Sequence, residues 1–309
     1  MAEFIIALVQ GILLVLLAPL ASGIARWFRA KVHTRKGPSI FQDYRDIAKL
    51  LKRQDVHSNV SSRVSRIMPP LYIGCMIVLG MGMPMATRFS PIPFLADIIL
   101  VIYMLALPRF FFALSGIDSG DAYAGTGGVR ELIMGTLIEP SLMLALFVAA
   151  LACGTTNVGT MGQMVGAGTV QSPIAFVIAG IAFAVACYIE MGKLPYDEAE
   201  AEQELQEGPL QELSGPSLAM MHIAVPMKQV VLASMFVAIF LPFGSAVDLS
   251  VAGLAVGTVV YLVKMVVILV VTMVIENCVS RVRWKFVGHQ TWFVFAIAVC
   301  AFAFCVLGI

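Results

Sequence analysis

The sequence predicts an all-α integral membrane protein, a bundle of about eight transmembrane helices with an amphipathic interfacial helix in the first cytoplasmic loop. Of its 309 residues, 60% are hydrophobic and only 13% are charged, whereas soluble domains carry about 25% charged residues. Eight apolar segments approach or exceed the roughly 20 residues that a helix needs to cross a bilayer. A spanning barrel would instead show alternating segments of about ten residues. Composition and segment length therefore indicate a helical membrane protein.

No internal repeat and no low-complexity linker divides the chain. We therefore expect residues 1–309 to form a single multi-span membrane domain. The eight expected spans are residues 4–24, 69–87, 94–115, 131–153, 173–189, 218–243, 249–275 and 291–309.

The distribution of basic residues predicts the orientation, because Lys and Arg accumulate in cytoplasmic loops. The loops after the second, fourth and sixth spans hold only Arg88 and Asp248 between them. We therefore expect both termini to be periplasmic, and the basic first loop and the acidic loop at residues 190–215 to be cytoplasmic. The basic residues behind this prediction are Arg26, Arg29, Lys31, Arg35, Lys36, Arg45, Lys49, Lys52, Arg53, Arg63 and Arg66 in the first loop, and Arg281, Arg283 and Lys285 in the last.

Within the first loop, the stretch FQDYRDIAKLLKRQ at residues 41–54 predicts a short helix lying in the membrane interface. Its apolar side chains recur at helical spacing, and its basic side chains fall largely off that stripe. Such a helix can neutralise anionic lipid, at about 1 kcal/mol for each basic residue near the surface. It can equally dock a partner protein, and the residues suit both roles.

A second notable loop, at residues 190–215, contains eight of the nineteen acidic residues. Such a run is often a solvated loop. Here it is interleaved with apolar residues such as Leu194, Tyr196 and Leu205, which a solvated loop does not need. We therefore expect the loop to fold back on the membrane domain, where desolvation and mutual repulsion raise carboxylate pKa values.

Several ionisable residues lie inside the expected spans, where each suggests a functional site. Glu139 and Lys264 lie deep in their spans, and we expect them to be functional and to act as a buried ion pair. His222 and Glu276 lie near span ends and are expected to snorkel to the interface. Arg130 and Glu131 are expected to form a cap or a local pair. Spacing alone leaves a proton relay, an ion pathway and a substrate transporter all open.

The six cysteines and four histidines are scattered and form no CxxC pair or other metal-binding pattern. No nucleotide-binding loop or nucleophile motif is present. We expect no cofactor or metal in this chain, and no nucleic-acid partner. Any redox chemistry is expected to belong to another subunit.

Four separated motifs, agreeing in order and spacing, resemble the family of subunit 1 of NADH:quinone oxidoreductase (complex I), which includes its counterpart in membrane-bound, energy-converting [NiFe] hydrogenases. The matching residues are Arg35–Pro38 (RKGP) with Gln42, Asp46 and Lys49; Arg130 with Glu139; Glu190, Pro195, Tyr196, Asp197, Glu200, Glu202, Glu204 and Leu205 with Ser214 and Gly215; and Lys264 with Arg281 and Arg283.

Three departures favour the hydrogenase branch over the quinone enzymes. The first loop lacks the additional stretch that the quinone enzymes carry after their Gly-Pro. Val225-Pro226 replaces a Glu-Tyr pair, and Glu276 replaces an arginine. Long stretches, among them EMGKLPYDEAEAEQELQEGPL, are similar to the formate hydrogenlyase and hydrogenase 4 membrane subunits. These differences make a quinone site less expected.

The resemblance implies a non-catalytic membrane anchor and coupling subunit of a hydrogen-evolving complex in the bacterial inner membrane. Its implied partners are a hydrogenase large subunit with a Ni-Fe centre, a small subunit with iron-sulfur clusters, an antiporter-like membrane subunit and membrane lipid. A quinone-site subunit of a complex I type enzyme and a free-standing ion transporter remain alternatives. The lack of a visible inverted repeat counts against the transporter.

The resemblance, together with the charges inside the spans, yields two sets of candidate residues. Within the acidic loop we expect Glu190, Glu200, Glu202 and Glu204 to face inward, and Glu198 and Glu212 to face water. The expected proton-relay residues are Glu139, Glu190, Asp197, Glu200, Glu202, Glu204, Glu207, Lys228, Lys264 and Glu276. The expected partner-docking residues are Arg35, Lys36, Gln42, Arg45, Asp46, Lys49, Arg130, Arg281 and Arg283.

Overall fold

The computed structural model describes residues 2–308, apart from the side chains of Ala2 and Glu202. Eight of its helices are long and apolar enough to cross a membrane, which confirms the predicted fold class and number of spans. They are α1 (Ala2–Val32), α3 (Arg63–Gly82), α4 (Ile98–Asp118), α5 (Ala122–Cys153), α7 (Pro173–Glu190), α9 (Gly215–Phe240), α10 (Val251–Cys278) and α11 (Trp284–Val306). Over the described residues there are no strands, only two isolated bridges.

Five short helices lie between the spans. They are α2 (Gln42–Leu50), η1 (Pro93–Ala96), α6 (Val158–Ala167), α8 (Glu202–Leu205) and η2 (Gly208–Glu212). Helix α2 is the predicted amphipathic helix, and it buries Asp43 and Ile47 against the bundle. Its Arg45 and Lys49 are exposed, as is Lys52 just after it.

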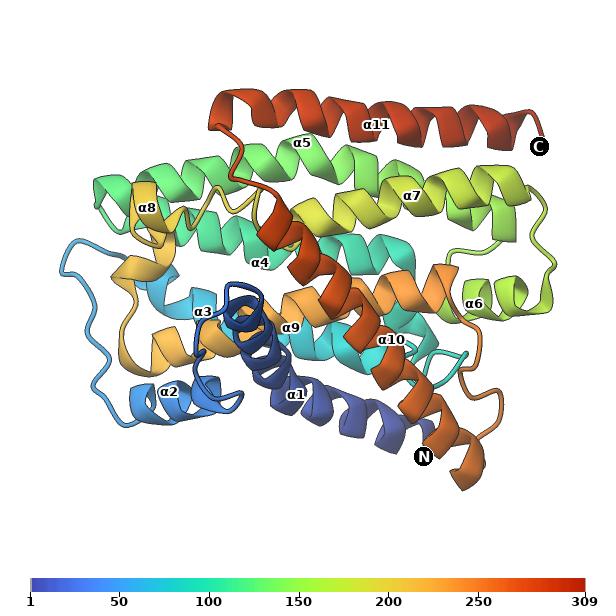
Figure 1. Cartoon of the computed structure of the whole chain (residues 1–309), viewed down its shortest axis with the longest axis horizontal. Coiled ribbons are helices and arrows are strands. Elements are labelled where there is room, and N and C mark those ends of the chain that lie inside the picture. The colour runs from blue at the N-terminus through green and yellow to red at the C-terminus, as the bar shows by residue number, and fades with distance from the viewer. Residues whose placement is uncertain (1, 309) are drawn as a thin grey trace.

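The start of α1 and the end of α11 lie at one end of the bundle, and α2 and α8 lie at the other (Figure 1). The eight spans cross the bundle alternately, so the first loop, the acidic loop and the turn before α11 gather at the same end. This arrangement agrees with the prediction that the basic and acidic loops share one side of the membrane.

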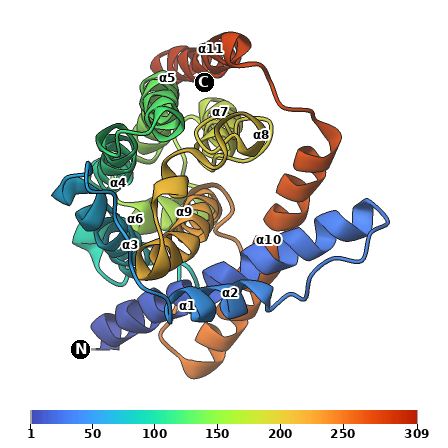
Figure 2. The same ribbon diagram turned by 90° about the vertical axis from the view of Figure 1, so that its left-hand side faces the viewer.

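The core of the bundle is formed by α3, α4, α5, α7 and α9, and α11 packs against α5 and α7. Helix α10 stands apart from this core (Figure 2) and contacts mainly α1 and α9. Only 17% of its most apolar stretch is buried within the chain, compared with 61% for α7 and for α9. A hydrogen bond of 2.7 Å between Ser234 and Tyr261 links α9 to α10.

Several span boundaries differ from the sequence prediction, those of α3 and α5 among them. Helix α3 begins at Arg63, before its two prolines, because Ser62 caps it by accepting a hydrogen bond of 3.2 Å from the backbone N–H of Val64. It ends at Gly82, since Met83 precedes a proline and a helical conformation is disfavoured there. Helix α5 begins well before the predicted residue 131, because Asp121 accepts hydrogen bonds from the backbone N–H groups of Tyr123 and Ala124.

The early start of α5 places its first turns beside the acidic loop. With 32 residues at about 1.5 Å each, the helix is longer than the roughly 30 Å core of a bilayer. Arg130 and Glu131 therefore lie inside a continuous helix, and each forms its described ion pairs with another element. The expectation that they form a cap or a local pair was wrong.

Candidate functional site

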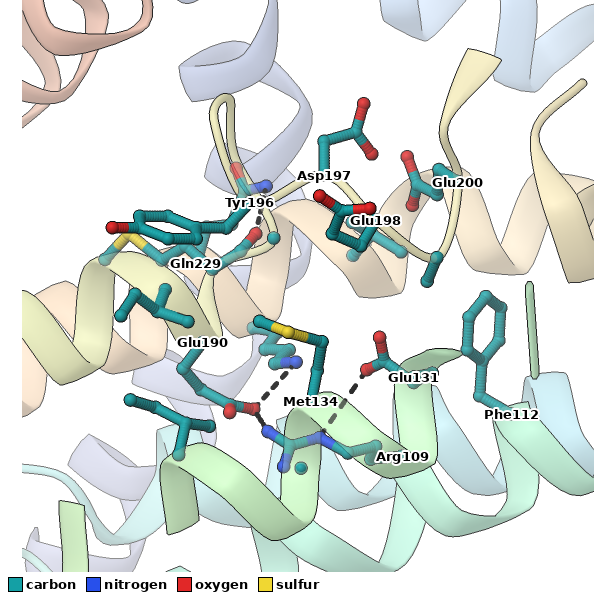
Figure 3. A pocket seen from close by; sticks show the side chains of 18 of the residues that line it. Arg109, Phe112, Glu131, Met134, Glu190, Tyr196, Asp197, Glu198, Glu200 and Gln229 are labelled. Carbon is teal, nitrogen blue, oxygen red and sulfur yellow. Dashed lines mark hydrogen bonds and ion pairs between the residues drawn. The ribbon is translucent and has the colours of Figure 1, made fainter. Parts of the chain in front are cut away.

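Five charged side chains from four helices meet beneath the acidic loop, and we call them the inner charge group. They are Arg109 on α4, Glu131 and Glu139 on α5, Glu190 at the end of α7 and Lys228 on α9. Figure 3 shows Arg109 reaching between Glu131 and Glu190. Three of these residues, Arg109, Glu190 and Lys228, are between 5% and 7% exposed. Charges this deep in a membrane protein must be paired.

Arg109 is the centre of the inner charge group. Its Nη1 lies 2.8 Å from Oε1 of Glu139, its Nε lies 3.5 Å from Oε1 of Glu131, and its Nη2 contacts Glu190. The planar guanidinium has donors on several edges, so a single arginine can hold three carboxylates, which a lysine ammonium is less suited to do. Lys228 shares Glu190, with its Nζ 2.8 Å from Oε1.

The sequence of α5 makes room for this arrangement. Glu131, Gly135 and Glu139 are spaced four residues apart and so lie on one face of the helix. A Cβ atom at Gly135 would lie 2.8 Å from Nη1 of Arg109, so a larger residue there would displace the guanidinium. The glycine lets Arg109 lie along α5 between the two carboxylates.

A narrow cavity of about 70 Å³, the inner cavity, lies between this group and the acidic loop. Its lining includes Glu131, Glu190 and Lys228 from the inner charge group, and Glu198 and Glu200 from the loop. One water molecule needs roughly 15 Å³ by the same measure. The inner cavity therefore has room for a few water molecules between buried charges and loop carboxylates.

The acidic loop folds back on the membrane domain, as expected from its apolar residues. Ala199, Ala201 and Leu205 are buried, and the loop passes close to α5, where a Cβ at Gly127 would lie 2.6 Å from the carbonyl oxygen of Ala199. Backbone contact this close brings the loop carboxylates to the mouth of the inner cavity.

The structure corrects the expected facing of two loop carboxylates. Glu198 was expected to face water but is only 2% exposed, and it lies 3.6 Å from Arg130. Glu204 was expected to face inward, but its side chain is 52% exposed, although it pairs with Arg130 at 2.9 Å. The family match falls on Glu204, but facing is decided by the local backbone, in which Ala201 has the left-handed φ of +31°.

Burial raises the pKa of the Glu198 carboxyl from its ordinary value of 4.5, with the nearby Arg130 opposing the shift and Glu204 adding to it. A raised pKa keeps this carboxyl protonated to a higher pH than an exposed glutamate. The nearby guanidinium of Arg130 also lies 5.6 Å over the ring of Trp284.

The remaining loop carboxylates have mixed surroundings. Glu190 is buried as expected, and Asp197 pairs with Arg281 at 2.7 Å. Glu200 and Glu212 are partly buried and Glu207 is exposed. The side chain of Glu202 lies outside the described part of the chain, so its inward position stays a prediction.

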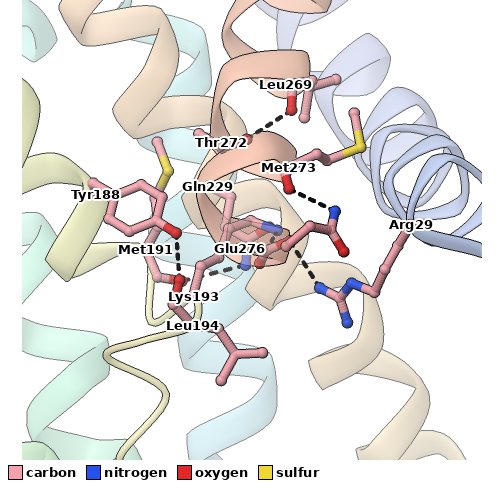
Figure 4. Close-up of polar contacts among 11 residues, drawn as sticks. Arg29, Tyr188, Met191, Lys193, Leu194, Gln229, Leu269, Thr272, Met273 and Glu276 are labelled. Carbon is pink, nitrogen blue, oxygen red and sulfur yellow. Dashed lines mark hydrogen bonds and ion pairs between the residues drawn. The ribbon is translucent and has the colours of Figure 1, made fainter. Parts of the chain in front are cut away.

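Glu276 does not snorkel, contrary to the expectation. Its side chain is 2% exposed and lies 2.8 Å from Nη2 of Arg29 on α1 and 3.3 Å from Nζ of Lys193 in the acidic loop. Figure 4 shows Arg29 and Lys193 converging on Glu276. The carboxylate stays buried because two cations come to it from other elements. His222, by contrast, is exposed.

Lys264 and Glu139 do not form the expected ion pair. Glu139 is held by Arg109, whereas Nζ of Lys264 donates hydrogen bonds of 2.6 Å and 2.5 Å to the carbonyl oxygens of Leu241 and Phe243. These carbonyls follow the last turn of α9, where a cation is favourable. Lys264 therefore caps α9 at the far end of the bundle from the acidic loop.

The expected docking residues separate into two sets. Arg35, Lys36, Arg45, Lys49 and Arg283 are exposed, whereas Arg130 and Arg281 are partly buried against loop carboxylates. Gln42 and Asp46 hydrogen bond to each other at 3.0 Å.

The first loop is fastened to the end of the acidic loop. The Ser214 hydroxyl accepts a 2.7 Å hydrogen bond from the backbone N–H of Val56 and donates one of 2.9 Å to its carbonyl oxygen. The hydroxyl of Ser217 donates a hydrogen bond of 2.7 Å to Asp55. The two charged loops thus form one connected surface.

Sequence reasoning missed Arg109, Arg29 and Lys193 as partners of the buried carboxylates. Arg109 carried a usable signal, because it is an arginine in the middle of a predicted span. Arg29 and Lys193 carried none, since both lie in segments already counted as charged loops. Among the described residues, no group of three or more His, Cys, Asp or Glu could hold a metal ion.

Comparisons with known proteins agree with this architecture. The sequence model for the NADH dehydrogenase family matches residues 4–307. The chain is 48% identical over 305 residues to hydrogenase-4 component C of Escherichia coli (strain K12), covering 99% of this chain and 96% of that protein. It is 43% identical over 295 residues to formate hydrogenlyase subunit 4 of the same organism, covering 96% of each.

More distant relatives include NADH-quinone oxidoreductase subunit 8 of Rhodothermus marinus, which is 27% identical over 202 residues, or 62% of this chain and 57% of that protein. A chain of the membrane-bound sulfane sulfur reductase, an archaeal respiratory membrane complex, superposes over 100% of both chains with a TM-score of 0.85 at 24% identity. This last likeness shows a shared fold.

Proposed function

Because this chain belongs to the NADH dehydrogenase family, the family of complex I subunit 1, we propose that it is the membrane anchor and coupling subunit of a hydrogen-evolving [NiFe] hydrogenase complex. Its similarity to hydrogenase-4 component C and formate hydrogenlyase subunit 4 supports the hydrogenase branch. We place the complex in the bacterial inner membrane, with both termini periplasmic. The Ni-Fe centre and the iron-sulfur clusters belong, in this proposal, to the large and small subunits, and an antiporter-like subunit lies beside the chain in the membrane.

The observation that carries this proposal is the contact between the inner charge group and the acidic loop across the inner cavity. Glu190, Arg109 and Lys228 lie within the bundle, while Glu198 and Glu200 line the same cavity from the loop. A partner bound to the loops would therefore lie a short distance from charges buried in the membrane. A proton taken up by a loop carboxylate can reach the inner charge group through water in the inner cavity.

Docking is assigned to the surface that the two fastened loops share. Arg35, Lys36, Arg45 and Lys49 are exposed, and none of them belongs to an ion pair among the residues that the structure describes. Exposed basic side chains beside an acidic loop suit a partner that carries both signs of charge. Anionic lipid can cover part of the same basic surface.

Reversal of these four residues to Glu tests the docking role. We expect the soluble hydrogenase subunits to leave the membrane fraction while the variant chain still inserts. Reversal of the exposed Arg63 and Arg66, on the same side of the membrane, is the matched control and should leave the complex intact. Retention of the soluble subunits by the fourfold variant at physiological salt contradicts the docking role. A salt titration separates specific docking from diffuse attraction, which weakens gradually with ionic strength.

Amide substitutions test the relay. Glu190→Gln and Glu139→Gln should lower hydrogen evolution per assembled complex, whereas Glu212→Gln should not. Complex abundance is measured for each variant, because loss of a buried charge can also prevent assembly. Full activity in both of the first two variants rules out the relay. A quinone bound tightly in the purified complex would instead favour the alternative function, a quinone-site subunit of a complex I type enzyme.

A further inference from the structure

Three cavities meet where the acidic loop leaves α7. The first is the inner cavity. The second, which we call the mouth cavity, has a volume of about 410 Å³ and lies between the acidic loop, α1 and the end of α10, with Arg29, Lys193, Glu276 and Arg281 in its walls. The third, the membrane-side cavity, has a volume of about 20 Å³ and lies between α1, α9 and α10.

Among the described residues, Gln229 alone lines all three cavities. It follows Lys228 of the inner charge group on α9, and its side-chain amide donates a hydrogen bond of 3.3 Å to the carbonyl oxygen of Met191. Figures 3 and 4 both place it beside the start of the acidic loop. Its amide therefore lies at the partition between the mouth cavity and the inner cavity.

The inner cavity can be reached at this point from the membrane-side cavity or from the mouth cavity, and these two differ in the chemistry of their walls. The membrane-side cavity is lined largely by apolar residues, such as Ala25, Val230 and Leu269, and is large enough for about one water molecule. The mouth cavity is larger and is lined by charged and amide side chains, and it shares Gly192, Asp197 and Glu200 with the inner cavity. Water is thus favoured on the mouth side and disfavoured on the membrane side.

We propose that Gln229 is a positioning residue that connects water in the mouth cavity with water in the inner cavity, so that the inner charge group exchanges protons with the loop side through this mouth. The inference rests on the proposed relay function and adds its point of entry. An amide both donates and accepts hydrogen bonds. Gln229 therefore orders a water chain while its own protonation stays unchanged, and the proton moves from one water molecule to the next.

The test measures water access directly. The carboxyl of Glu198 lines the inner cavity and not the mouth cavity, so its hydrogen–deuterium exchange reports on water that reaches the inner cavity. Infrared difference spectra of the purified complex, transferred into D₂O at mildly acidic pH, follow the protonated carboxyl band. Loss of that band in Glu198→Gln assigns it.

Gln229→Met keeps the length of the side chain and removes its hydrogen bonding. We expect exchange at Glu198 to slow at least tenfold, and hydrogen evolution per assembled complex to fall with it. Gln229→Ala leaves space for water, so exchange at Glu198 should proceed at or above the wild-type rate. This variant also keeps the inference testable if Gln229→Met does not assemble. The control is Gln203→Met, since Gln203 lines the mouth cavity but not the inner cavity. Exchange at Glu198 in this variant should match that of the wild type.

The possible results distinguish a failure of the proposed role of Gln229 from a failure of the proposed proton relay. Wild-type exchange in Gln229→Met, or slowed exchange in Gln229→Ala, overturns the role of Gln229. Slowed exchange in Gln229→Met with unchanged hydrogen evolution supports the water junction and contradicts the relay. Slowed exchange in the Gln203 control to the same degree also overturns the assignment, because the effect then belongs to the mouth as a whole.

Discussion

Nζ of Lys228 lies 2.8 Å from Oε1 of Glu190, and the two side chains are 9% and 3% exposed. Arg109 contacts the same carboxylate oxygen. Glu190 thus has two cationic partners. Lys228, by contrast, contacts one carboxylate among the described ion pairs, that of Glu190. The contact is therefore asymmetric, since loss of the acid isolates Lys228 but loss of Lys228 leaves Glu190 paired.

This asymmetry predicts unequal losses of stability. Glu190→Gln leaves the Lys228 ammonium without its carboxylate. We therefore expect the complex to lose about 3–5 kcal/mol of stability, the usual cost of removing one partner of a buried pair. Lys228→Met should lose less, and the double variant less than the sum of the two. Complex abundance and the thermal midpoint of the purified complex give the three values. Lys52→Met, at an exposed position of the first loop, is the control. Strict additivity of the two substitutions contradicts the pairing.

The buried Glu198 predicts a pH dependence of stability. Because burial raises the pKa of its carboxyl in the folded chain above the ordinary 4.5, the folded state holds the proton more tightly than the unfolded state. The resulting stability is fully present below pH 4.5 and is lost as the pH rises through the raised pKa, by at most about 1.4 kcal/mol per pH unit.

Glu198→Gln should therefore flatten the pH dependence and raise the thermal midpoint near pH 7, while Arg130 keeps Glu204 as a partner. Thermal unfolding of the purified complex between pH 4.5 and 8 measures both effects. Glu207→Gln, at an exposed position of the same loop, should follow the wild-type curve. A wild-type slope in Glu198→Gln would show that another group titrates.

The ion pair between Arg29 and Glu276 predicts rescue by charge exchange. Glu276→Lys places a third cation beside Arg29 and Lys193, so the end of α10 should detach from α1 and complex abundance should fall severalfold. Adding Arg29→Glu should restore at least half of the lost abundance, because the exchanged charges again attract. Lys285→Glu, at an exposed position after the same turn, is expected to be neutral. The pairing is wrong if the second substitution worsens the first.

The spans could be predicted from the sequence because each is a long apolar run, and the helices follow those runs to within a few turns. Pairings inside the bundle could not be predicted in the same way. Glu139 and Lys264 both lie deep in their spans, but depth alone does not say which helices are neighbours. In the structure, one contacts α4 and the other the end of α9.

A sequence pattern could also not predict which side chains of the acidic loop face inward. Gln206 and Glu207 adopt left-handed backbone conformations, with φ of +49° and +74°, although neither is a glycine or an asparagine. Such turns break any regular periodicity, so adjacent acidic residues can lie on opposite sides. Glu198 and Glu200, in contrast, line the same cavity because the loop packs against α5.

Arg109 is synthesised before every one of its carboxylate partners, since Glu131, Glu139 and Glu190 all follow it in the chain. An arginine in the middle of a lone apolar helix opposes insertion by roughly 2.5–3.5 kcal/mol. A turn at residues 119–121 joins α4 directly to α5, and α5 brings the first two carboxylates. Helices α4 and α5 therefore form the smallest unit that can enter the bilayer with Arg109 neutralised. We therefore expect α5 to favour the insertion of α4 during translation, and α7 and α9 to add Glu190 and Lys228 to this hairpin later, since both helices follow it in the chain.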